Sequence, residues 1–225
     1  MVKYYLTSQY PCSYLDDRQA RSEIAVATPE EFGQLIRAGF RRSGAFVYRP
    51  YCRDCSDCIA VRVDTAHFHP NRSQRRCLKR FRSLQVASRG LEFEPEHYDL
   101  YMRYQRTRHP GGSMEAEEQY REALLASHVL THLYEFREDD RLVMISIVDE
   151  IEDGLSSVYT FYDPGRQDAG LGTYGILWQI DLCRKLGYPH LYLGYWIERS
   201  KKMAYKINFQ PLEGYIDGKW STLSK

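Results

Sequence analysis

The sequence has no long hydrophobic run and no excess of charge of one sign. Its longest apolar stretch, residues 142–148, is far too short to cross a bilayer, and its first residues form no continuous apolar segment of the kind that a signal peptide needs. We therefore expect neither a membrane protein nor an exported one, and the cytoplasm is the expected compartment. With 31 Lys and Arg against 30 Asp and Glu, the formal net charge of +1 also excludes a polycation that binds nucleic acid along its whole length.

The near balance of charge conceals an uneven distribution along the chain. Residues 1–90 contain 16 Lys and Arg and 8 Asp and Glu, whereas residues 91–225 contain 15 and 22. A basic segment can attract a polyanion, and an acidic segment cannot do so alone. We therefore expect two domains with different tasks, one over residues 1–90 and one over residues 91–225.

The pattern of apolar and turn-forming residues predicts an α+β protein. Thr28 is an expected N-cap before Pro29, and Gly39 ends the helix that follows. Further helices are expected over residues 71–84, 95–106, 116–125, 172–186 and 200–208, and strands over residues 46–48, 61–63, 131–137, 142–148, 155–162, 190–195 and 213–220. In the C-terminal domain, antiparallel strands precede a Gly-containing loop, a helix, a strand and a last helix. This is the order of the acetyltransferase-like (GNAT) fold, which we expect there.

Residues 71–84 form the most distinctive of these helices. At about 100° per residue, its cations share one face without a carboxylate, and Cys77 lies on the opposite, apolar face. The cations are Arg72, Arg75, Arg76, Lys79, Arg80 and Arg82. Most charge runs are only solvated faces. Like charges one helical turn apart repel by about 0.2–0.5 kcal/mol per pair, however, and a bound polyanion would remove that cost, so we favour a nucleic-acid contact.

Three cysteines are close together in the turn Cys52-x-x-Cys55-x-x-Cys58. Thiolates at this spacing can hold Zn²⁺ or an iron–sulfur cluster, but three ligands alone do not close a structural zinc site. The fourth ligand would have to be Cys12, His67 or His69. The alternative, a turn packed by reduced thiols, requires no ion and is the one that we favour.

Two segments of the C-terminal domain also carry chemistry. The loop that contains Gly170 and Gly172 precedes a helix, so its backbone N–H groups and those of Thr173 could hold a phosphate. Further on, Tyr195 and Trp196 end a strand and lead into Lys201, Lys202 and Lys206. These side chains are either an aromatic and cationic wall for a nucleotide or a carboxylate, or core aromatics beside surface lysines.

Together these segments resemble the arginyl-tRNA–protein transferases over nearly the whole chain, most closely the short bacterial members that transfer leucine. The resemblance rests on Cys12-x-Tyr14-Leu15, Arg18-x-x-Arg21-x-Glu23, Gly39-Phe40-Arg41-Arg42-Ser43-Gly44, Tyr48-Arg49-Pro50 with the three-Cys turn, Val61-Arg62-Val63, the basic helix, Phe161-Tyr162-Asp163-Pro164, Leu171-Gly172-Thr173-Tyr174, Tyr192-Leu193-Gly194-Tyr195-Trp196-Ile197 and Lys201-Lys202-Met203-x-Tyr205-Lys206.

The resemblance implies an N-terminal domain rich in Cys and Arg, and an acetyltransferase-like C-terminal domain. It implies transfer of an amino acid from aminoacyl-tRNA to the α-amine of a protein that begins with Asp or Glu, whose product enters the N-degron pathway. Leucyl-tRNA is the expected donor and arginyl-tRNA the alternative. Arginyl-transferring members hold a metal or an iron–sulfur cluster with a Cys-x-x-Cys pair and adjacent cysteines. Here Leu15 replaces the second cysteine of that pair, so we expect no required cofactor, with Cys12, Cys52, Cys55 and Cys58 as the candidate metal ligands.

The resemblance and the residue chemistry together assign candidate binding residues. Contacts to tRNA are expected from Arg72, Arg75, Arg76, Lys79, Arg80, Gly170, Gly172, Thr173, Lys201 and Lys206. An acidic first residue requires a cation, ideally the two-pronged guanidinium of an arginine, and the candidates are Arg18, Arg21, Arg41, Arg42 and Lys202. A leucyl side chain would be enclosed by Tyr162, Tyr174, Leu177 or Trp196.

The expected reaction is aminolysis of an ester, which needs a neutral amine and a stabilised oxyanion but no covalent enzyme intermediate. Asp163, at a strand end, is the first choice for orienting the amine, and Tyr162 and Tyr195 are second choices. Asp163 could equally be a turn residue before Pro164. Two other classes stay open, a non-catalytic metal-containing RNA-binding module and a small-molecule acetyltransferase.

Overall fold

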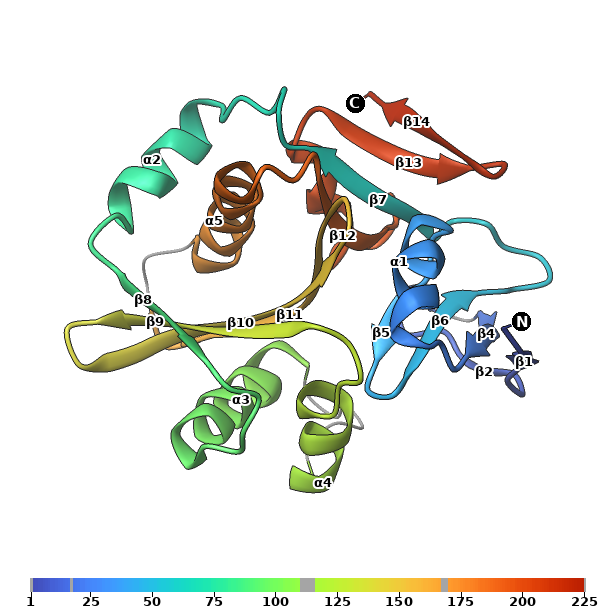
Figure 1. The fold of residues 1–225 in the computed structure, drawn as a ribbon, viewed down its shortest axis with the longest axis horizontal. Coiled ribbons are helices and arrows are strands. Elements are labelled where there is room, and N and C mark those ends of the chain that lie inside the picture. Colours follow the sequence, from blue (N-terminus) through green and yellow to red (C-terminus); the bar gives the residue numbers. More distant parts are fainter. Residues whose placement is uncertain (1, 17, 110–115, 167–169, 225) are drawn as a thin grey trace.

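A computed structural model describes residues 2–16, 18–109, 116–166 and 170–224, and its centre is an eight-stranded mixed sheet (Figure 1). Only one neighbouring pair in this sheet is parallel, β11 with β12. In spatial order the strands are β14 (Lys219–Leu223), β13 (Leu212–Ile216), β7 (Ile59–Asp64), β12 (His190–Trp196), β11 (Gly154–Tyr162), β10 (Arg141–Ile151), β9 (Thr131–Glu138) and β8 (Gln85–Arg89). The chain is thus a mixed α/β protein.

Helices cover both faces of the large sheet (Figure 1). α5 (Leu171–Leu186) and α2 (Arg72–Arg80) pack on one face, where Phe136, Met144 and Leu177 are among the buried side chains. α3 (Pro95–Arg108), α4 (Glu117–Tyr120) and a π-helical turn, η1 (Arg121–Leu125), lie on the other face. Tyr101, Tyr120 and Phe161 are fully buried there. Among the helices of the described residues, none combines the length and the hydrophobicity that a membrane span requires.

A smaller four-stranded antiparallel sheet is built from the first fifty residues. Its order is β1 (Tyr4–Leu6), β4 (Ser22–Ala25), β6 (Phe46–Pro50) and β5 (Arg41–Ser43), and β2 (Tyr10–Pro11) pairs separately with β3 (Gln19–Ala20). α1 (Pro29–Arg37) begins at the expected N-cap, Thr28, which forms a capping box with Glu31, so that each side chain accepts from the other's backbone N–H. Phe32 and Ile36 of α1 pack against Tyr192 and Ile151 of the large sheet. Residues before position 90 therefore supply strands to both sheets, and a domain boundary at residue 90 stays a prediction.

The expected helix over residues 200–208 is wrong in its first half. Only Ala204–Asn208 is helical, as the 3-10 turn η2, and it follows a tight turn in which Ser200 O accepts from the N–H groups of Met203 and Ala204. The segment folds back onto the end of β12, because the Trp196 indole N–H donates to Ala204 O and the Lys206 amine donates to Tyr195 O. These contacts to β12 take the place of a continuous helix.

A buried carboxylate joins α3 to strands β8 and β9. Glu135 accepts hydrogen bonds from Arg137 and Arg89, each at 3.1 Å, and lies 2.7 Å from His97 Nε2. Burial alone would raise the pKa of Glu135, but the hydrogen bonds from Arg137, His97 and Arg89 lower it to about 2. Glu135 is therefore ionised at neutral pH and fixes one edge of the sheet.

Candidate functional site

A pocket of about 460 Å³ opens where the C-terminal half of α2 faces the first turn of α5. It is lined by Ser73, Arg76, Cys77, Arg80, Gly170 and Thr173. The two helices meet closely, because Cys77 Sγ lies 3.4 Å from Gly170 O, and Gly170 has φ +129°, where a Cβ would lie 3.3 Å from that sulfur. The structure thus brings together the basic helix and the Gly-containing helix start, two separate expectations from the sequence.

The charge of this pocket is positive from two sources. Arg76 and Arg80 are one turn apart on α2, where Asn71 and Gln74 form the N-terminal capping box. The first backbone N–H groups of α5 have no acceptor within their own helix, and the partial positive charge at that end of the helix adds to the field. A phosphate group would meet two guanidinium groups, the Thr173 hydroxyl and backbone donors in one place.

Behind the first turn of α5 lies Tyr162, at the end of β11. A Cβ on Gly172 would lie 3.2 Å from the Tyr162 ring, so Gly172 lets this ring pack on the helix start. The Tyr162 ring centroid is 5.0 Å from that of Tyr104, and the Arg108 guanidinium carbon is 5.7 Å from it. Among the described residues, the Tyr162 hydroxyl has no hydrogen-bond partner, so it is free to contact a substrate.

Tyr162 and five other tyrosines, which reach the cysteine turn, together form what we call the tyrosine cluster. Its members are Tyr14, Tyr48, Tyr104, Tyr162, Tyr195 and Tyr205, which interact electrostatically with one another or with Arg41. Burial raises the pKa values of Tyr14, Tyr104 and Tyr195 above their ordinary range. Their hydroxyl groups therefore stay neutral, and the cluster supplies hydrogen-bonding groups without negative charge.

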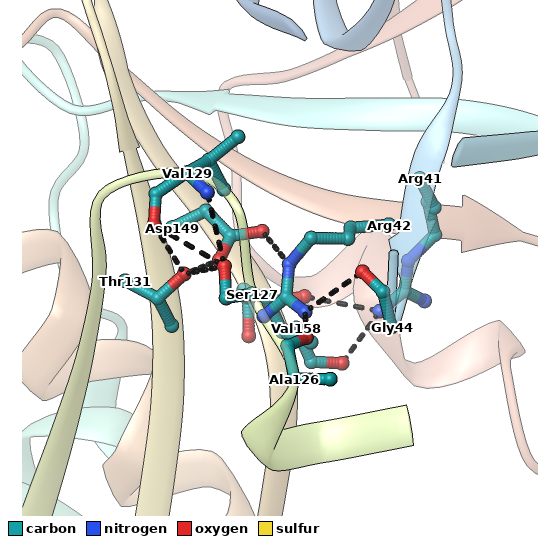
Figure 2. Close-up of polar contacts among 10 residues, drawn as sticks. Arg41, Arg42, Gly44, Ala126, Ser127, Val129, Thr131, Asp149 and Val158 are labelled. Carbon is teal, nitrogen blue, oxygen red and sulfur yellow. Dashed lines mark hydrogen bonds and ion pairs between the residues drawn. The ribbon is translucent and has the colours of Figure 1, made fainter. Parts of the chain in front are cut away.

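Arg41 and Arg42 are neighbours on β5 but have different surroundings (Figure 2). Arg42 is fully buried and forms an ion pair with Asp149, also fully buried, at 2.8 Å, and its Nη1 donates to Ala126 O at 3.0 Å and to Gly44 O at 3.3 Å. Arg41 donates instead to the backbone carbonyls of Ser157 and Val158 and faces the tyrosine cluster. Arg42 is thus neutralised by the protein, whereas Arg41 has no carboxylate partner among the described residues.

The three other candidates for binding an acidic residue lie elsewhere. Arg18 is exposed and donates to Asp54 O at 3.5 Å, while Arg21 is half-buried and donates to Thr7 O at 2.9 Å. Lys202 is exposed, near His109. Of the two lysines predicted to contact tRNA, Lys201 is exposed and Lys206 is buried. The recognition and tRNA assignments stay predictions, but the structure does not bring the five candidates for the acidic residue together.

The carboxylate of Asp163 is occupied by the protein's own donors. Oδ1 accepts from Arg103 and from the Gly165 N–H, both at 3.0 Å, and Oδ2 accepts from Arg141. The Tyr195 hydroxyl lies 3.1 Å from Gly39 O and 3.0 Å from Tyr48 O. Tyr162 is therefore the one of the three predicted catalytic residues whose functional group is open, and all three roles stay predictions.

The four candidate metal ligands lie near one another but are not arranged as a metal site. Cys58 interacts electrostatically with Cys52, Cys12 and Cys55, and burial raises the pKa of the Cys58 thiol to about 12. Within the described ranges, no group of three or more His, Cys, Asp or Glu side chains is placed to hold an ion. A metal or cluster at this turn therefore stays a prediction.

The leucine-pocket candidates belong to one hydrophobic core but not to one opening. Tyr174 and Leu177 line a second pocket of about 320 Å³ beside α2, with Phe68 and Trp178. Trp196 packs over η2. Of the four candidates only Tyr162 belongs to the tyrosine cluster, so a pocket for an apolar side chain stays a prediction.

Three neighbours of Tyr162 could not be predicted as such from the sequence, namely Tyr104, Tyr205 and Arg108. Tyr104 and Arg108 lie on α3, four residues apart and hence on one face, and this face could have been recognised from its spacing. No local pattern indicates which end of the sheet such a helix face will reach.

Comparisons with known proteins agree over both halves of the chain. Residues 10–76 match the family model described as the N terminus of arginine-tRNA-protein transferase, and residues 96–216 match the model of its C terminus. An aspartate/glutamate leucyltransferase of Thiobacillus denitrificans is 53% identical over 99% of this chain and 95% of its own length. One of Nitrosospira multiformis is 51% identical over 99% and 91%.

One solved structure, that of L-PGS from Bacillus licheniformis, is 13% identical, with a TM-score of 0.47 over 74% of this chain and 50% of that one. A likeness at that level does not establish a shared fold. The two family models and the full-length relatives do establish the family. The chain belongs to the arginine-tRNA-protein transferase family.

Proposed function

We propose that this protein transfers leucine from leucyl-tRNA to the α-amine of proteins that begin with Asp or Glu. The observation that carries the proposal is the 53% identity, over 99% of the chain, to a protein named aspartate/glutamate leucyltransferase. The positive pocket between α2 and α5, next to an uncharged cluster of tyrosines and one unpaired arginine, is compatible with an anionic donor and an acidic acceptor.

The pocket between α2 and α5 is the proposed site for phosphates of the tRNA. Arg76, Arg80, Gly170 and Thr173 line it, and Gly172 lies in the same helix turn. Arg72, Arg75 and Lys79 continue the basic surface along α2, where all three are exposed. Phosphate contacts position a nucleic acid without reading its sequence, so this surface would orient the acceptor end and leave the identity of the amino acid to another part of the site.

The proposed chemistry joins the α-nitrogen of the acceptor protein to the carbonyl carbon of the leucyl ester. The C–N bond forms as the ester C–O bond breaks, and the ribose oxygen of the tRNA leaves as a hydroxyl, which takes up the proton that the neutral amine loses. Tyr162 contacts Gly172 in the first turn of α5 and neighbours Tyr205, which itself neighbours Arg41, so we place the ester beside Tyr162, with the Tyr162 hydroxyl as a hydrogen-bond donor to the developing oxyanion. Asp163 would act through Arg103 and Arg141, which it holds, and Tyr195 through the backbone carbonyls it contacts.

The proposal also includes the expected acetyltransferase-like fold, the expected fate of the product and the expected absence of a required cofactor. The strand and helix order from β9 to η2 supports the acetyltransferase-like fold, and the separation of two parallel strands after a short pairing supports it further. The product would enter the N-degron pathway in the cytoplasm. The transfer requires no cofactor, because the ester already activates the leucyl group.

A transfer assay with two donors tests the proposal. Radiolabelled leucyl-tRNA and arginyl-tRNA are each offered with peptides that differ only in the first residue, Asp, Glu or Asn. Transfer of leucine to the Asp and Glu peptides, with little to the Asn peptide, is the expected result. Transfer of arginine instead would make the protein an arginyltransferase. Salt-dependent tRNA binding without any transfer, or acetylation of a small amine from acetyl-CoA, would overturn the proposal altogether.

A further inference from the structure

The two parallel strands of the large sheet separate shortly after they meet. β11 and β12 pair only from Gly154 opposite His190 to Ser156 opposite Tyr192. The next two backbone carbonyls of β11, those of Ser157 and Val158, turn instead to the guanidinium of Arg41, whose Nη2 donates to them at 3.0 and 2.8 Å (Figure 2). A cation from the small sheet thus occupies the place where the partner strand would continue.

On the other strand, Gly194 makes room for this guanidinium. Its φ is +73°, the register of β12 against β7 shifts between Tyr192 and Gly194, and a Cβ at this position would lie 2.3 Å from Arg41 Nη1. No side chain other than hydrogen can be accommodated without moving Arg41. Gly194 is therefore a positioning residue for Arg41.

Lys206 is a buried cation beside the half-buried Arg41. The residue is 4% exposed, its amine donates to Tyr195 O at 2.6 Å and lies 3.5 Å from Met203 Sδ, and its charged neighbour is Arg41. In the described part of the chain, neither cation has a carboxylate within ion-pair distance. Burial and the nearby Arg41 lower the pKa of Lys206 well below its ordinary value.

The groups around the two cations carry no compensating charge either. They are the hydroxyls of Tyr48, Tyr14, Tyr195 and Tyr205 and the thiol of Cys58. A buried cation without a partner costs several kcal/mol, and proteins keep such a cost where a ligand removes it. An anion of single charge, held by hydrogen bonds from Arg41 and Lys206, would do so. The lining of the phosphate pocket on α2 includes neither Arg41 nor Lys206, so the two cations do not belong to that pocket.

We propose that Arg41 and Lys206 together form the binding site for the acidic side chain of the acceptor, and that Lys206 belongs to this site instead of contacting tRNA. The inference rests on the proposed function, because the occupant is the Asp or Glu of the acceptor protein. Arg41, Lys206 and the Gly194 bend would together make the enzyme select a carboxylate over the amide of Asn or Gln. The amide has the same shape but brings no negative charge to the two cations.

The test is steady-state transfer of leucine by Lys206→Met, Lys206→Arg and the control Lys219→Met, an exposed lysine on β14. For Lys206→Met we expect kcat/KM for an Asp peptide to fall about 10- to 100-fold, the range for losing a hydrogen bond to a charged group. The slow transfer to an Asn peptide and the KM for leucyl-tRNA should not change. Lys206→Arg should recover part of the preference for Asp, and Lys219→Met should behave as the wild type.

Three results would overturn the inference. An equal fall in kcat/KM for the Asp and Asn peptides would indicate a structural role for Lys206. A raised KM for leucyl-tRNA would indicate a tRNA contact, and an unchanged preference for the Asp peptide would exclude Lys206 from the carboxylate site. Should the variants fail to fold, the wild-type protein decides, because an Asp peptide should raise its melting temperature and the matching Asn peptide should not. This binding test is independent of catalysis. Wild-type protein that binds the Asp peptide selectively but transfers nothing would refute the proposed function and leave the carboxylate site standing.

Discussion

The buried pair of Arg42 and Asp149 permits a sharp test of how the small sheet is held to the large one. Both side chains are 0% exposed, and besides Arg42 the Asp149 carboxylate accepts a hydrogen bond from Thr131 at 2.6 Å. In Arg42→Met the carboxylate stays buried with one neutral partner, and the backbone carbonyls of Gly44 and Ala126 lose their donor. Removing one member of a fully buried pair costs about 3–5 kcal/mol, which is a large part of the roughly 5–15 kcal/mol by which a protein is stable.

Urea unfolding followed by circular dichroism measures this cost. We expect Arg42→Met to lower the free energy of unfolding by about 3–5 kcal/mol, and the double variant Arg42→Met/Asp149→Asn to be at least about 2 kcal/mol more stable than the sum of the two single losses predicts. Lys185→Met, which removes the exposed pair with Asp181, should cost less than about 1 kcal/mol.

Additive losses in the double variant, or a loss below about 1 kcal/mol in Arg42→Met, would refute this account of the pair. Arg42→Met protein that is folded at low temperature should keep the KM of the wild type for an Asp peptide. A strongly raised KM would return Arg42 to the residues that bind the acceptor.

Three further outcomes are expected. Because the pKa of Glu135 is lowered to about 2, its ionisation contributes at most about 3 kcal/mol to the free energy of unfolding, and this contribution is complete above pH 4.5 and is lost as the pH falls toward 2. The free energy of unfolding of Glu135→Gln, measured by urea titration at a series of pH values, should therefore depend less on pH over this range. Arg76→Ser with Arg80→Ser should weaken tRNA binding and reduce the slope of log K against log salt by about one per lost phosphate contact, measured by filter binding from low to moderate salt. Phe161→Ala, at a fully buried position against Tyr101, should lower the unfolding free energy by about 3–5 kcal/mol in urea titration without changing the salt dependence of tRNA binding.

Elements with strong local signals could be predicted from the sequence. The Thr28 N-cap and the helix end at Gly39 depend on bonds within a few residues, and both are confirmed. The central strands β9 to β12 are long and apolar and were also predicted. In contrast, β4, β5 and β8 were not predicted, because these strands are short or polar. β4 and β5 become strands only by pairing with β6, and β8 only by pairing with β9.

In the candidate site, too, features that depend on neighbouring residues could be predicted from the sequence, and features that depend on the fold could not. The basic face of α2 and the Gly170 turn were recognised as separate anion-binding features, since each depends only on neighbours in sequence. Their meeting in one pocket depends on how α5 packs on α2. Arg41 and Arg42 could not be told apart in the sequence, because adjacent residues of a strand point to opposite sides and only the fold shows that Asp149 lies on one of them. Lys206 could not be told from the exposed Lys201 either, because only the fold shows that its amine donates to Tyr195 O.

The position of β7 has a consequence for the order in which the protein folds. β7 lies between β12 and β13, and Val63 is paired with both Leu191 and Leu212. Loop closure over so many residues is slow compared with local pairing. During synthesis the first seventy residues emerge with the apolar side chains of Val61 and Val63 exposed. These side chains are buried only after nearly the whole chain has been made, because β12 and β13 lie near the C-terminal end of the sequence. We expect a protein interrupted after residue 186 to require chaperone protection, whereas the meander from β9 to β11 can already form on the ribosome.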